Sequence, residues 1–504
     1  MPSLSDSRTP SVWIDTCPVP TFPALDGDLE TEIAVIGAGI VGVLCAHFLT
    51  QAGHKVALIE ARRVLYGVTG NTTAKVSACH GLMYDHVRSH FGEGKAQMYA
   101  EANRSAIDWI EGASVDCDFR RRDLYLYAED EAAVKELEKE AEAAQAAGLE
   151  CQLVQDLEAP FPNSGALLFT NQAEFHPLKF LTKLLEGAVA KGCQVFESTM
   201  ATDLDEGEPT VVETADGHKI RAQHVVVATH FPFFDPGYYY ARLDPFRDYA
   251  IAFSLDGECP KAMYVGSGEG YTYRCQATAD GEVLIVSGAM HKVGKMEHTT
   301  TQYAAIETFV REHFPVRAIT HMWSTQDNGT IDQVPYIGRI SANAERVWVA
   351  CGFGGWGMTQ GVVAAQLLTS LIKGENPALA DLYDPLRFKP LTSAPTIGKI
   401  VKDSVRGLVG ERLADGPEFS VSALKPGEGD VFDTDDGKVG FYRDENEELH
   451  AVSAVCTHMG CILAFNNAER SWDCPCHGSR FDTDGTVLHG PAVSPLKKVA
   501  ATEE

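Results

Sequence analysis

Three features are scarce in this sequence: long apolar runs, basic residues and repeated segments. No window of the 504 residues reaches the roughly 18 consecutive apolar residues of a membrane-spanning helix, and the first twenty residues lack the apolar core of a signal peptide. Lysine and arginine total 42 against 70 aspartate and glutamate residues, a formal net charge of −28. Because nucleic acids and anionic membrane surfaces attract basic patches, this charge argues against both as partners. The lack of a long apolar window predicts no integral membrane segment.

The remaining composition is that of a globular protein, with 45% hydrophobic and 22% charged residues. A chain of 504 residues is long enough for about two to four domains. Most of the 13 cysteines lie far apart in the sequence, as buried thiols do in a reducing compartment. The sequence therefore predicts a cytoplasmic protein.

The front of the chain has the pattern of a strand, a glycine turn and a helix. An apolar strand at Glu32–Ile36 leads into Gly37-Ala38-Gly39-Ile40-Val41-Gly42, an apolar helix runs to Gln51, and a second strand at Lys55–Ile59 ends in Glu60. Gly37 makes the tight turn, Gly39 lets the backbone approach a pyrophosphate, and Gly42 lets the helix pack on the strand. The helix N-terminus faces the phosphates, and Glu60 can accept from a ribose hydroxyl. This segment predicts a bound dinucleotide, and the lack of a second such fingerprint favours FAD alone.

Cysteine and histidine gather near the C-terminus in two short motifs, Cys456-Thr457-His458 and Cys474-Pro475-Cys476-His477. Two thiolates can hold one iron of a [2Fe–2S] pair while two imidazoles hold the other, which raises the reduction potential above that of an all-thiolate cluster. A zinc site also uses such pairs at short spacing, so zinc is the alternative, beside chance clustering.

These two motifs, with a Gly-Ser after the second histidine, resemble the Rieske [2Fe–2S] signature. In the cytochrome bc-type branch of that family, Ser479 matches a serine that donates to the cluster, and Phe481 stands where those proteins have a tyrosine. The resemblance therefore implies an electron-transfer cluster of intermediate potential. It assigns roles to six residues: Cys456 and Cys474 on one iron, His458 and His477 on the other, and Cys461 with Cys476 in a disulfide.

The segment after Glu60 is rich in glycine and hydroxyl groups and resembles the stretch with which D-amino-acid-oxidase-like (DAO) flavoproteins cradle FAD. The helix expected at Pro177–Gly192, the strand at Val225–Thr229, and the closing segments Asp332–Gly338 and Cys351–Thr359 follow in family order. Because Cys79-His80 departs from the pattern of relatives that tether FAD, we expect FAD to bind non-covalently. The resemblance implies these cofactor-binding residues: Gly37, Gly39, Gly42, Glu60, Thr69, Gly70, Thr72, Thr73, Ala74, Lys75, Ala228, Thr229, Gly352, Gly354, Gly355, Gly357, Met358 and Thr359.

Together the two resemblances imply an α/β Rossmann-like FAD-binding domain with an inserted α+β substrate domain, followed by an all-β Rieske domain. We expect an N-terminal extension at 1–30, the FAD-dependent oxidoreductase domain at 31–390, a linker with a connector helix at 391–415, and the Rieske domain at 416–504. The two prolines at 390 and 395 mark the boundary before the linker.

The expected function is that of an FAD-dependent dehydrogenase. It oxidises an amine or amino-acid-like small molecule and passes electrons to the cluster and on to an external acceptor, such as a small redox protein or a quinone system. Two alternatives are a reductase in which electrons enter through the Rieske domain, and a flavin oxidase whose cluster is a redox sensor or structural element. Arg274 is a candidate to bind a substrate carboxylate by two hydrogen bonds, and His291, Trp323 and Trp356 are further pocket candidates.

Overall fold

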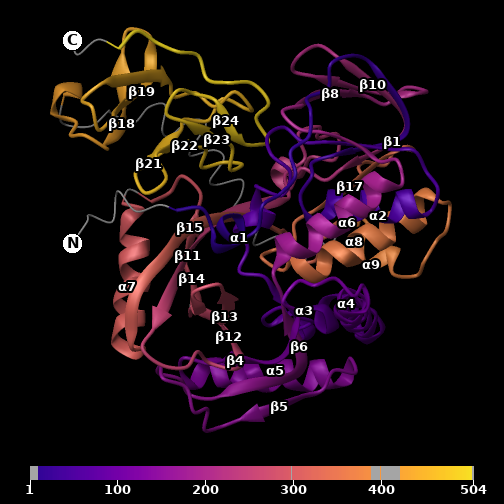
Figure 1. Ribbon diagram of the computed structural model, residues 1–504, viewed down its shortest axis with the longest axis vertical. Helices are drawn as coiled ribbons and strands as arrows, with labels where there is room; N and C mark the ends of the chain where they lie inside the picture. Colours follow the sequence, from indigo (N-terminus) through magenta and orange to yellow (C-terminus); the bar gives the residue numbers. More distant parts are fainter. Residues whose placement is uncertain (1–8, 269, 297, 388–397, 399–419, 502–504) are drawn as a thin grey trace.

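The computed structural model describes residues 9–268, 270–296, 298–387, 398 and 420–501. Two large sheets with their helices form the body of the protein, and a smaller unit of short strands follows at the C-terminal end (Figure 1). The predicted linker and connector helix at 391–415 lie outside the described residues, apart from residue 398.

The first sheet has the order β16-β17-β10-β1-β2-β7, with β9 attached to β10 and β8 to β9. Neighbours from β17 to β7 run parallel. Strand β2 reads Val-Ala-Leu-Ile and is buried along its whole length, as a parallel strand covered on both faces must be. The strands are β1 (Leu29–Ile36), β2 (Val56–Ile59), β7 (Gln194–Phe196), β8 (Ala201–Asp205), β9 (Thr210–Thr214), β10 (Lys219–Val227), β16 (Tyr336–Arg339) and β17 (Val347–Cys351).

Helix α2 packs against both α6 and α8 beside this sheet (Figure 1). Helix α2 is almost entirely buried, because nine of its twelve residues face either the sheet or α6 and α8. This packing brings the N-terminal ends of α2 and α8 to the same side of the fold. The helices are α1 (Val12–Thr16), α2 (Ile40–Gln51), α3 (Met83–Phe91), α4 (Glu93–Gly112), α5 (Glu131–Ala146), α6 (Pro177–Ala190), α7 (Thr300–His313), α8 (Gly357–Ile372) and α9 (Ala380–Tyr383).

The second sheet has the order β15-β11-β14-β13-β12-β4-β6-β3, with β5 attached to β6. Its long strands β11, β14 and β15 are antiparallel neighbours. Since side chains alternate along a strand, neighbouring residues of β11 serve opposite faces of the sheet. The strands are β3 (Lys75–Val76), β4 (Arg120–Tyr127), β5 (Cys151–Val154), β6 (Ala166–Glu174), β11 (Leu243–Leu255), β12 (Met263–Gly266), β13 (Thr272–Thr278), β14 (Gly281–Lys292) and β15 (Val316–Thr330).

The C-terminal unit consists of two small antiparallel sheets, β18-β19-β20 and β21-β22-β23-β24. Each has its own apolar cluster, one around Phe432 and Phe441 and the other around Trp472 and Phe481. The strands are β18 (Gly429–Thr434), β19 (Gly437–Arg443), β20 (Leu449–Ser453), β21 (Ala464–Asn466), β22 (Ser471–Asp473), β23 (Arg480–Asp482) and β24 (Val487–His489).

This architecture confirms the predicted fold class of an α/β unit, a second mixed unit and a C-terminal all-β domain. The predicted strand, helix and second strand of the glycine motif correspond to β1, α2 and β2, with boundaries that differ by at most three residues. No helix in the described part of the chain combines the length and apolar character needed to cross a membrane.

Candidate functional site

The glycine turn after β1 is tightly packed against the neighbouring strand and helix. Gly37 has a φ of +97°, and a Cβ atom there would lie 2.6 Å from the carbonyl oxygen of Ala228, just after β10. A Cβ on Gly42 would overlap the carbonyl oxygen of Gly37. The Glu60 carboxylate accepts a hydrogen bond from the amide of Ala38 at 2.9 Å. The turn therefore has the close contacts that a dinucleotide fingerprint needs, with the acid at the end of β2 directly beside it.

The expected FAD-cradling segment lies next to this turn. The Thr69 hydroxyl accepts from the amide of Ile40 at 2.8 Å and would lie 3.2 Å from a Cβ on Gly39. Side chains from distant elements hold the segment in place: Trp13 of α1 donates to the carbonyl of Thr72 at 2.6 Å, and Trp323 of β15 donates to that of Asn71 at 2.9 Å. The predicted pocket residue Trp323 thus supports the cradle.

Arg274 also supports this segment, which corrects its expected role. Its guanidinium is fully buried and donates to the carbonyls of Ala74 at 2.7 Å and Phe175 at 3.1 Å, and to Gln276 Oε1 at 2.6 Å. The ring of Trp13 covers its charge at 5.1 Å. Because these contacts occupy its donors inside the protein, Arg274 is not placed to bind a substrate carboxylate.

The glycine-rich segment after β17 forms the opposite side of the site. Gly352, Gly354 and Gly355 all have positive φ, at +76°, +58° and +91°. Asp327, at the end of β15, accepts from the amide of Gly355 at 2.7 Å and contacts His230 Nε2 at 3.1 Å. Asp327 was not predicted from the sequence, because a lone aspartate within a strand has no motif to single it out.

Helix α8 begins directly after this loop, at Gly357, and the predicted cofactor residues Met358 and Thr359 are buried in its first turn. The Thr359 hydroxyl donates to the carbonyl of Ser77 at 2.9 Å, which links the loop to the end of the cradling segment. Across the site, the amide of Ala228 donates to the carbonyl of Ile36, and the Thr229 hydroxyl donates to that of Phe231. The predicted cofactor residues from four distant segments therefore lie around one region.

His80 and Trp356 stack in this region, with ring centroids 4.9 Å apart. His80 is buried, its Nδ1 lies 2.6 Å from the Tyr99 hydroxyl, and its Nε2 lies 2.8 Å from the carbonyl of Ser77. Burial lowers the pKa of His80 to about 3, so the ring is neutral. Cys79 beside it is fully buried in the apolar core.

The four predicted cluster ligands come together on two loops of the C-terminal domain. The side chains of Cys456 and Cys474 interact with each other, and the rings of His458 and His477 are 5.0 Å apart. His458 Nδ1 and both ring nitrogens of His477 are buried and have no hydrogen-bond partner among the described residues. Unpaired buried nitrogens are costly unless they bind a metal, so these side chains fit a cluster with two thiolate and two imidazole ligands.

The residues around the ligands also match the expected arrangement. Cys461 and Cys476 form a disulfide between the two loops, with Cα atoms 6.7 Å apart. The Ser479 hydroxyl lies beside the Cys456 sulfur and accepts from the amide of Ala492 at 3.0 Å. Phe481 is fully buried in the same apolar cluster.

The C-terminal domain contacts the rest of the described chain, called here the flavin-cradle domain (residues 9–387), through the loop that contains His477. The ring of His477 lies 6.4 Å from Phe231 and 5.8 Å from Tyr240, measured between centroids. Its neighbour Gly478 accepts a hydrogen bond from Gln326 at 2.9 Å. A Cβ on Gly478 would lie 2.5 Å from the Gln326 side chain, so the two domains meet without a gap.

His291, the second predicted catalytic residue, lies near the contact between the two domains, and its ring nitrogens face groups outside the FAD-cradling segment. It pairs with Arg247 across β11 and β14, so the two side chains share a face of the sheet. Its Nε2 lies 3.0 Å from the Tyr249 hydroxyl, and its Nδ1 lies 2.8 Å from the carbonyl of Lys292. Arg247 in turn contacts Glu469 of the C-terminal domain at 3.2 Å.

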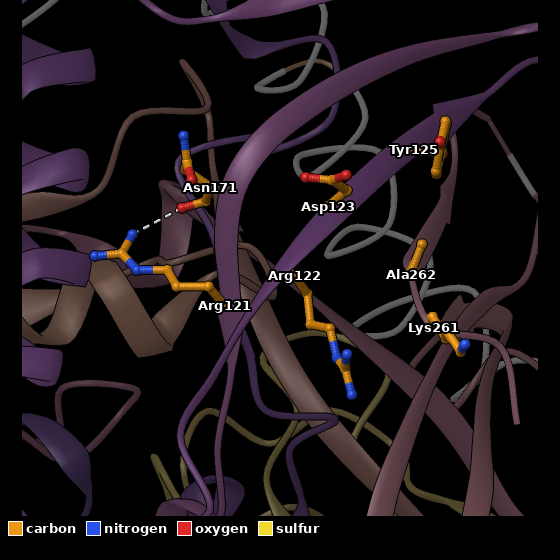
Figure 2. Close-up of a pocket in the computed structure, with 7 residues that line it drawn as sticks. All are labelled: Arg121, Arg122, Asp123, Tyr125, Asn171, Lys261 and Ala262. Atoms are coloured by element: carbon orange, nitrogen blue, oxygen red, sulfur yellow. Dashed lines mark hydrogen bonds between the residues drawn. The ribbon is translucent and has the colours of Figure 1, made fainter.

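A surface pocket of 390 Å³ lies at β4 and β6 (Figure 2). Its arginines already have partners: Arg121 donates to the carbonyl of Asn171 at 2.8 Å and to Asp108 at 2.7 Å, and Arg122 donates to Glu174 at 2.9 Å. None of the predicted cofactor residues lines this pocket.

Comparison with known proteins identifies both parts of the chain. The family model for FAD dependent oxidoreductases (DAO) matches residues 32–371, and the Rieske [2Fe-2S] domain model matches residues 417–500. The chain is 39% identical over 497 residues to a putative Rieske 2Fe-2S iron-sulfur protein, YhfW, of Bacillus subtilis (strain 168), and the match covers 97% of each chain. It is 22% identical to the gamma-glutamylputrescine oxidoreductase of Escherichia coli (strain K12), over 70% of this chain and 86% of that protein.

A solved structure, that of L-amino acid deaminase from Proteus vulgaris with a deleted insertion, resembles the fold with a TM-score of 0.60 at 18% identity, over 75% of this chain and 99% of that one. The Rieske match decides against the zinc alternative, so the cofactors of this protein are FAD and a Rieske [2Fe-2S] cluster. The chain belongs to the DAO family of FAD-dependent oxidoreductases and has a C-terminal Rieske domain.

Proposed function

We propose that this oxidoreductase is a dehydrogenase that oxidises an amine or amino-acid-like small molecule and passes the electrons from FAD to the Rieske cluster and on to an external acceptor. When bound, FAD supplies the two-electron oxidation of the substrate, and the cluster carries single electrons. The substrate class is supported by the names of two similar proteins, a gamma-glutamylputrescine oxidoreductase and an L-amino acid deaminase.

One observation supports the proposed path of the electrons from FAD to the cluster. The predicted ligand His477 packs against the flavin-cradle domain at Phe231 and Tyr240. Phe231 stands two residues after Thr229, in the segment that follows β10. A second contact runs in parallel, because Asp327 bonds both the amide of Gly355 and His230, and His230 lies 3.2 Å from His489 of the Rieske domain. These contacts join residues expected at the flavin to residues beside the cluster.

The other histidine ligand supports an exit for the electrons. His458 is half-buried, and its neighbours Thr457 and Met459 are exposed. From Gly416 to the end, the chain has sixteen acidic residues against seven lysines and arginines, a net charge of −9. An acidic electron-transfer surface attracts a basic redox partner, so we propose a small basic redox protein as the acceptor, with a quinone system as the alternative.

We further propose that the protein works in the cytoplasm. The cysteines outside the Rieske loops are free thiols within the described structure, and eight of these nine are buried. Such single, buried thiols are typical of proteins in a reducing compartment.

The test is anaerobic mixing of the full-length holoprotein with glycine, L-proline, L-alanine, putrescine and gamma-glutamylputrescine, followed by absorbance and electron paramagnetic resonance. The proposal expects loss of the oxidised flavin band, followed by cluster reduction without oxygen. If a reduced protein donor fills the cluster first and the flavin second, while no amine reacts, the protein is a reductase. If peroxide forms in air at the same rate in a Cys456→Ala variant, the protein is an oxidase whose cluster is not an electron carrier.

A further inference from the structure

Four polar side chains form a chain across the interior of the second sheet. Lys75 Nζ donates to the Thr272 hydroxyl at 2.7 Å, and the hydroxyls of Thr272 and Ser287 are 3.0 Å apart. The Ser287 hydroxyl lies next to the Asp248 carboxylate and stabilises its charged form. Asp248, Ser287 and Thr272 lie on the neighbouring strands β11, β14 and β13, and Lys75 reaches Thr272 from β3, which lies at the far end of the same sheet.

This chain of side chains runs from the FAD-cradling segment to the buried carboxylate of Asp248. Lys75 is the last residue of the FAD-cradling segment, and its Nζ also lies 3.3 Å from the Thr73 hydroxyl. The amides of Tyr249 and Gly288 also stabilise the charged carboxylate of Asp248, but its Oδ1 atom is buried and has no hydrogen-bond partner within the part of the chain that the structure describes. A buried carboxylate oxygen without a donor is costly, and a substrate ammonium group would supply that donor.

We propose that Asp248, Ser287, Thr272 and Lys75 form the acid–base unit of the site, in which Asp248 binds the substrate amine and takes its proton. This inference rests on the proposed amine oxidation. The N–H bond of the substrate ammonium breaks, and an O–H bond forms on Asp248, which leaves a neutral amine ready for oxidation by FAD. The two hydroxyls then rotate so that Asp248 donates to Ser287, Ser287 to Thr272 and Thr272 to the neutral amine of Lys75. Each hydroxyl accepts one proton and gives one up, and Lys75 gains the proton that Asp248 loses.

The charges around the chain suit such a transfer. Burial raises the pKa of Asp248 to about 7, and the nearby Lys75 opposes that rise. Burial lowers the pKa of Lys75 to about 7, helped by the charge of Arg274 on β13 and opposed by Asp248 and by Glu174 on β6. A proton passes with little cost between groups of similar pKa, and both values lie near neutral pH, where general acid–base catalysis is most efficient.

The first test measures the limiting rate of flavin bleaching against pH, using the compound of the panel above that bleaches wild-type fastest. Asp248 must be ionised to accept the proton, so the wild-type rate should fall as the pH falls through about 7. Asp248→Asn should slow bleaching by about 10²–10⁴-fold. Lys75→Met removes a positive neighbour and should move the midpoint of the profile to higher pH.

Glu140→Gln is the matched control. Burial raises the pKa of Glu140 to about 7 as well, but its carboxylate caps α3 through the amides of Tyr84 and Asp85. This variant should keep the wild-type rate and pH profile. A wild-type profile without a step near neutral pH, or an Asp248→Asn variant that bleaches at the wild-type rate, would overturn the proposal.

A second readout does not depend on turnover. Asp248 and Glu140 both titrate near neutral pH, so the infrared difference spectrum of the holoprotein between pH 6 and pH 8 should contain a protonated-carboxyl band that only Asp248→Asn removes and a second one that only Glu140→Gln removes. If Asp248→Asn does not fold, Thr272→Val and Ser287→Ala interrupt the chain and leave both charged residues in place. Each should slow bleaching, and wild-type rates in both would overturn the relay.

The proposed substrate class and the proposed acid–base unit can be overturned separately. If no amine of the panel bleaches the wild-type flavin, the proposed substrate class is wrong, whatever the infrared bands show. If amines do bleach it and neither band responds to Asp248→Asn, only the acid–base unit is wrong.

Discussion

The guanidinium of Arg247 lies 3.2 Å from the carboxylate of Glu469, and this ion pair joins the flavin-cradle domain to the Rieske domain. The side chains are only 2% and 10% exposed, so the pair is shielded from solvent. Glu469 also accepts from the Tyr303 hydroxyl of α7 at 3.2 Å. Removing one partner of a buried pair costs about 3–5 kcal/mol, because the other charge is left without compensation.

Glu469→Ala should therefore weaken the contact between the domains. We expect a lower thermal unfolding midpoint and slower cluster reduction by the flavin, with unchanged flavin bleaching by substrate. Stopped-flow absorbance at flavin and cluster wavelengths separates the two steps. The control is Arg317→Ala, which breaks an ion pair with Asp256 whose side chains are both 64% exposed and which should cost less than about 1 kcal/mol. Cluster reduction at the wild-type rate in Glu469→Ala would show that this contact does not position the cluster.

The cluster and the flavin should be lost independently. Cys456→Ala or His477→Ala removes a predicted iron ligand, while the FAD cradle is built from residues before 360 and has its own apolar core. Both variants should purify with FAD and without iron, as measured by iron analysis and the visible spectrum. Cys45→Ala, at a buried thiol in α2, is the control and should retain both cofactors. If FAD were lost in step with iron, the two domains would not bind their cofactors separately.

Short motifs with a strict backbone requirement were predictable from the sequence. The turn from Gly37 to Gly42 needs residues without a Cβ at fixed positions, so the spacing of its glycines can be recognised in a single sequence. The cluster loops could also be predicted, because few residue types ligate iron and the spacing of the cysteines and histidines shows which ligand lies on which loop. The apolar pattern at Val362–Ile372 predicted most of helix α8, and the resemblance to the flavoprotein family predicted the end of strand β10 at Val225–Thr229.

Residues whose role depends on pairing across strands were not predictable. Arg274 stands in an aromatic strand that suggests a pocket, yet the carbonyls of Ala74, just before β3, and Phe175, just after β6, accept from its guanidinium. His291 was assigned to the site by its residue type alone, and its pairing with Arg247 places it at the domain contact. Asp248 and Asp327 have no neighbouring motif. Asp248 meets Ser287 through the pairing of β11 with β14, and Asp327 meets His230 and Gly355, which follow the distant strands β10 and β17.

FAD binding should depend on the small size of Gly39. A Cβ at this position would lie 3.2 Å from Thr69 Oγ1, and the branches of a valine would fill the space through which backbone approaches the pyrophosphate. Gly39→Val should therefore purify as a folded protein without FAD, seen in the flavin absorbance. Gly187→Ala in α6, where a Cβ meets nothing within 4 Å, should keep its FAD. Full FAD occupancy in a folded Gly39→Val protein would mean that the turn is only structural.

The potential of the cluster should respond to residue 481. Phe481 is fully buried, pairs with Trp472 between β23 and β22, and shares an apolar cluster with the ligand Cys474. Hydrogen bonds to cluster sulfurs stabilise the reduced, more negative state and so raise the potential. Ser479 is placed to give one such bond at Cys456, while the phenylalanine ring offers none. We therefore expect an intermediate potential, above that of all-thiolate ferredoxins and below that of the respiratory-complex type.

Phe481→Tyr adds a donor at this place and should raise the potential. A hydrogen bond to a charged group contributes about 1.5–3 kcal/mol, and only part of this energy differs between the oxidised and the reduced cluster. The expected rise in the one-electron reduction potential is therefore some tens of millivolts. A redox titration of the full-length protein, followed by electron paramagnetic resonance of the cluster, measures it. Phe441→Tyr is the control, because Phe441 is equally buried but belongs to the separate apolar cluster around Phe432. An unchanged or lowered potential in Phe481→Tyr would show that the added hydroxyl does not reach a cluster sulfur.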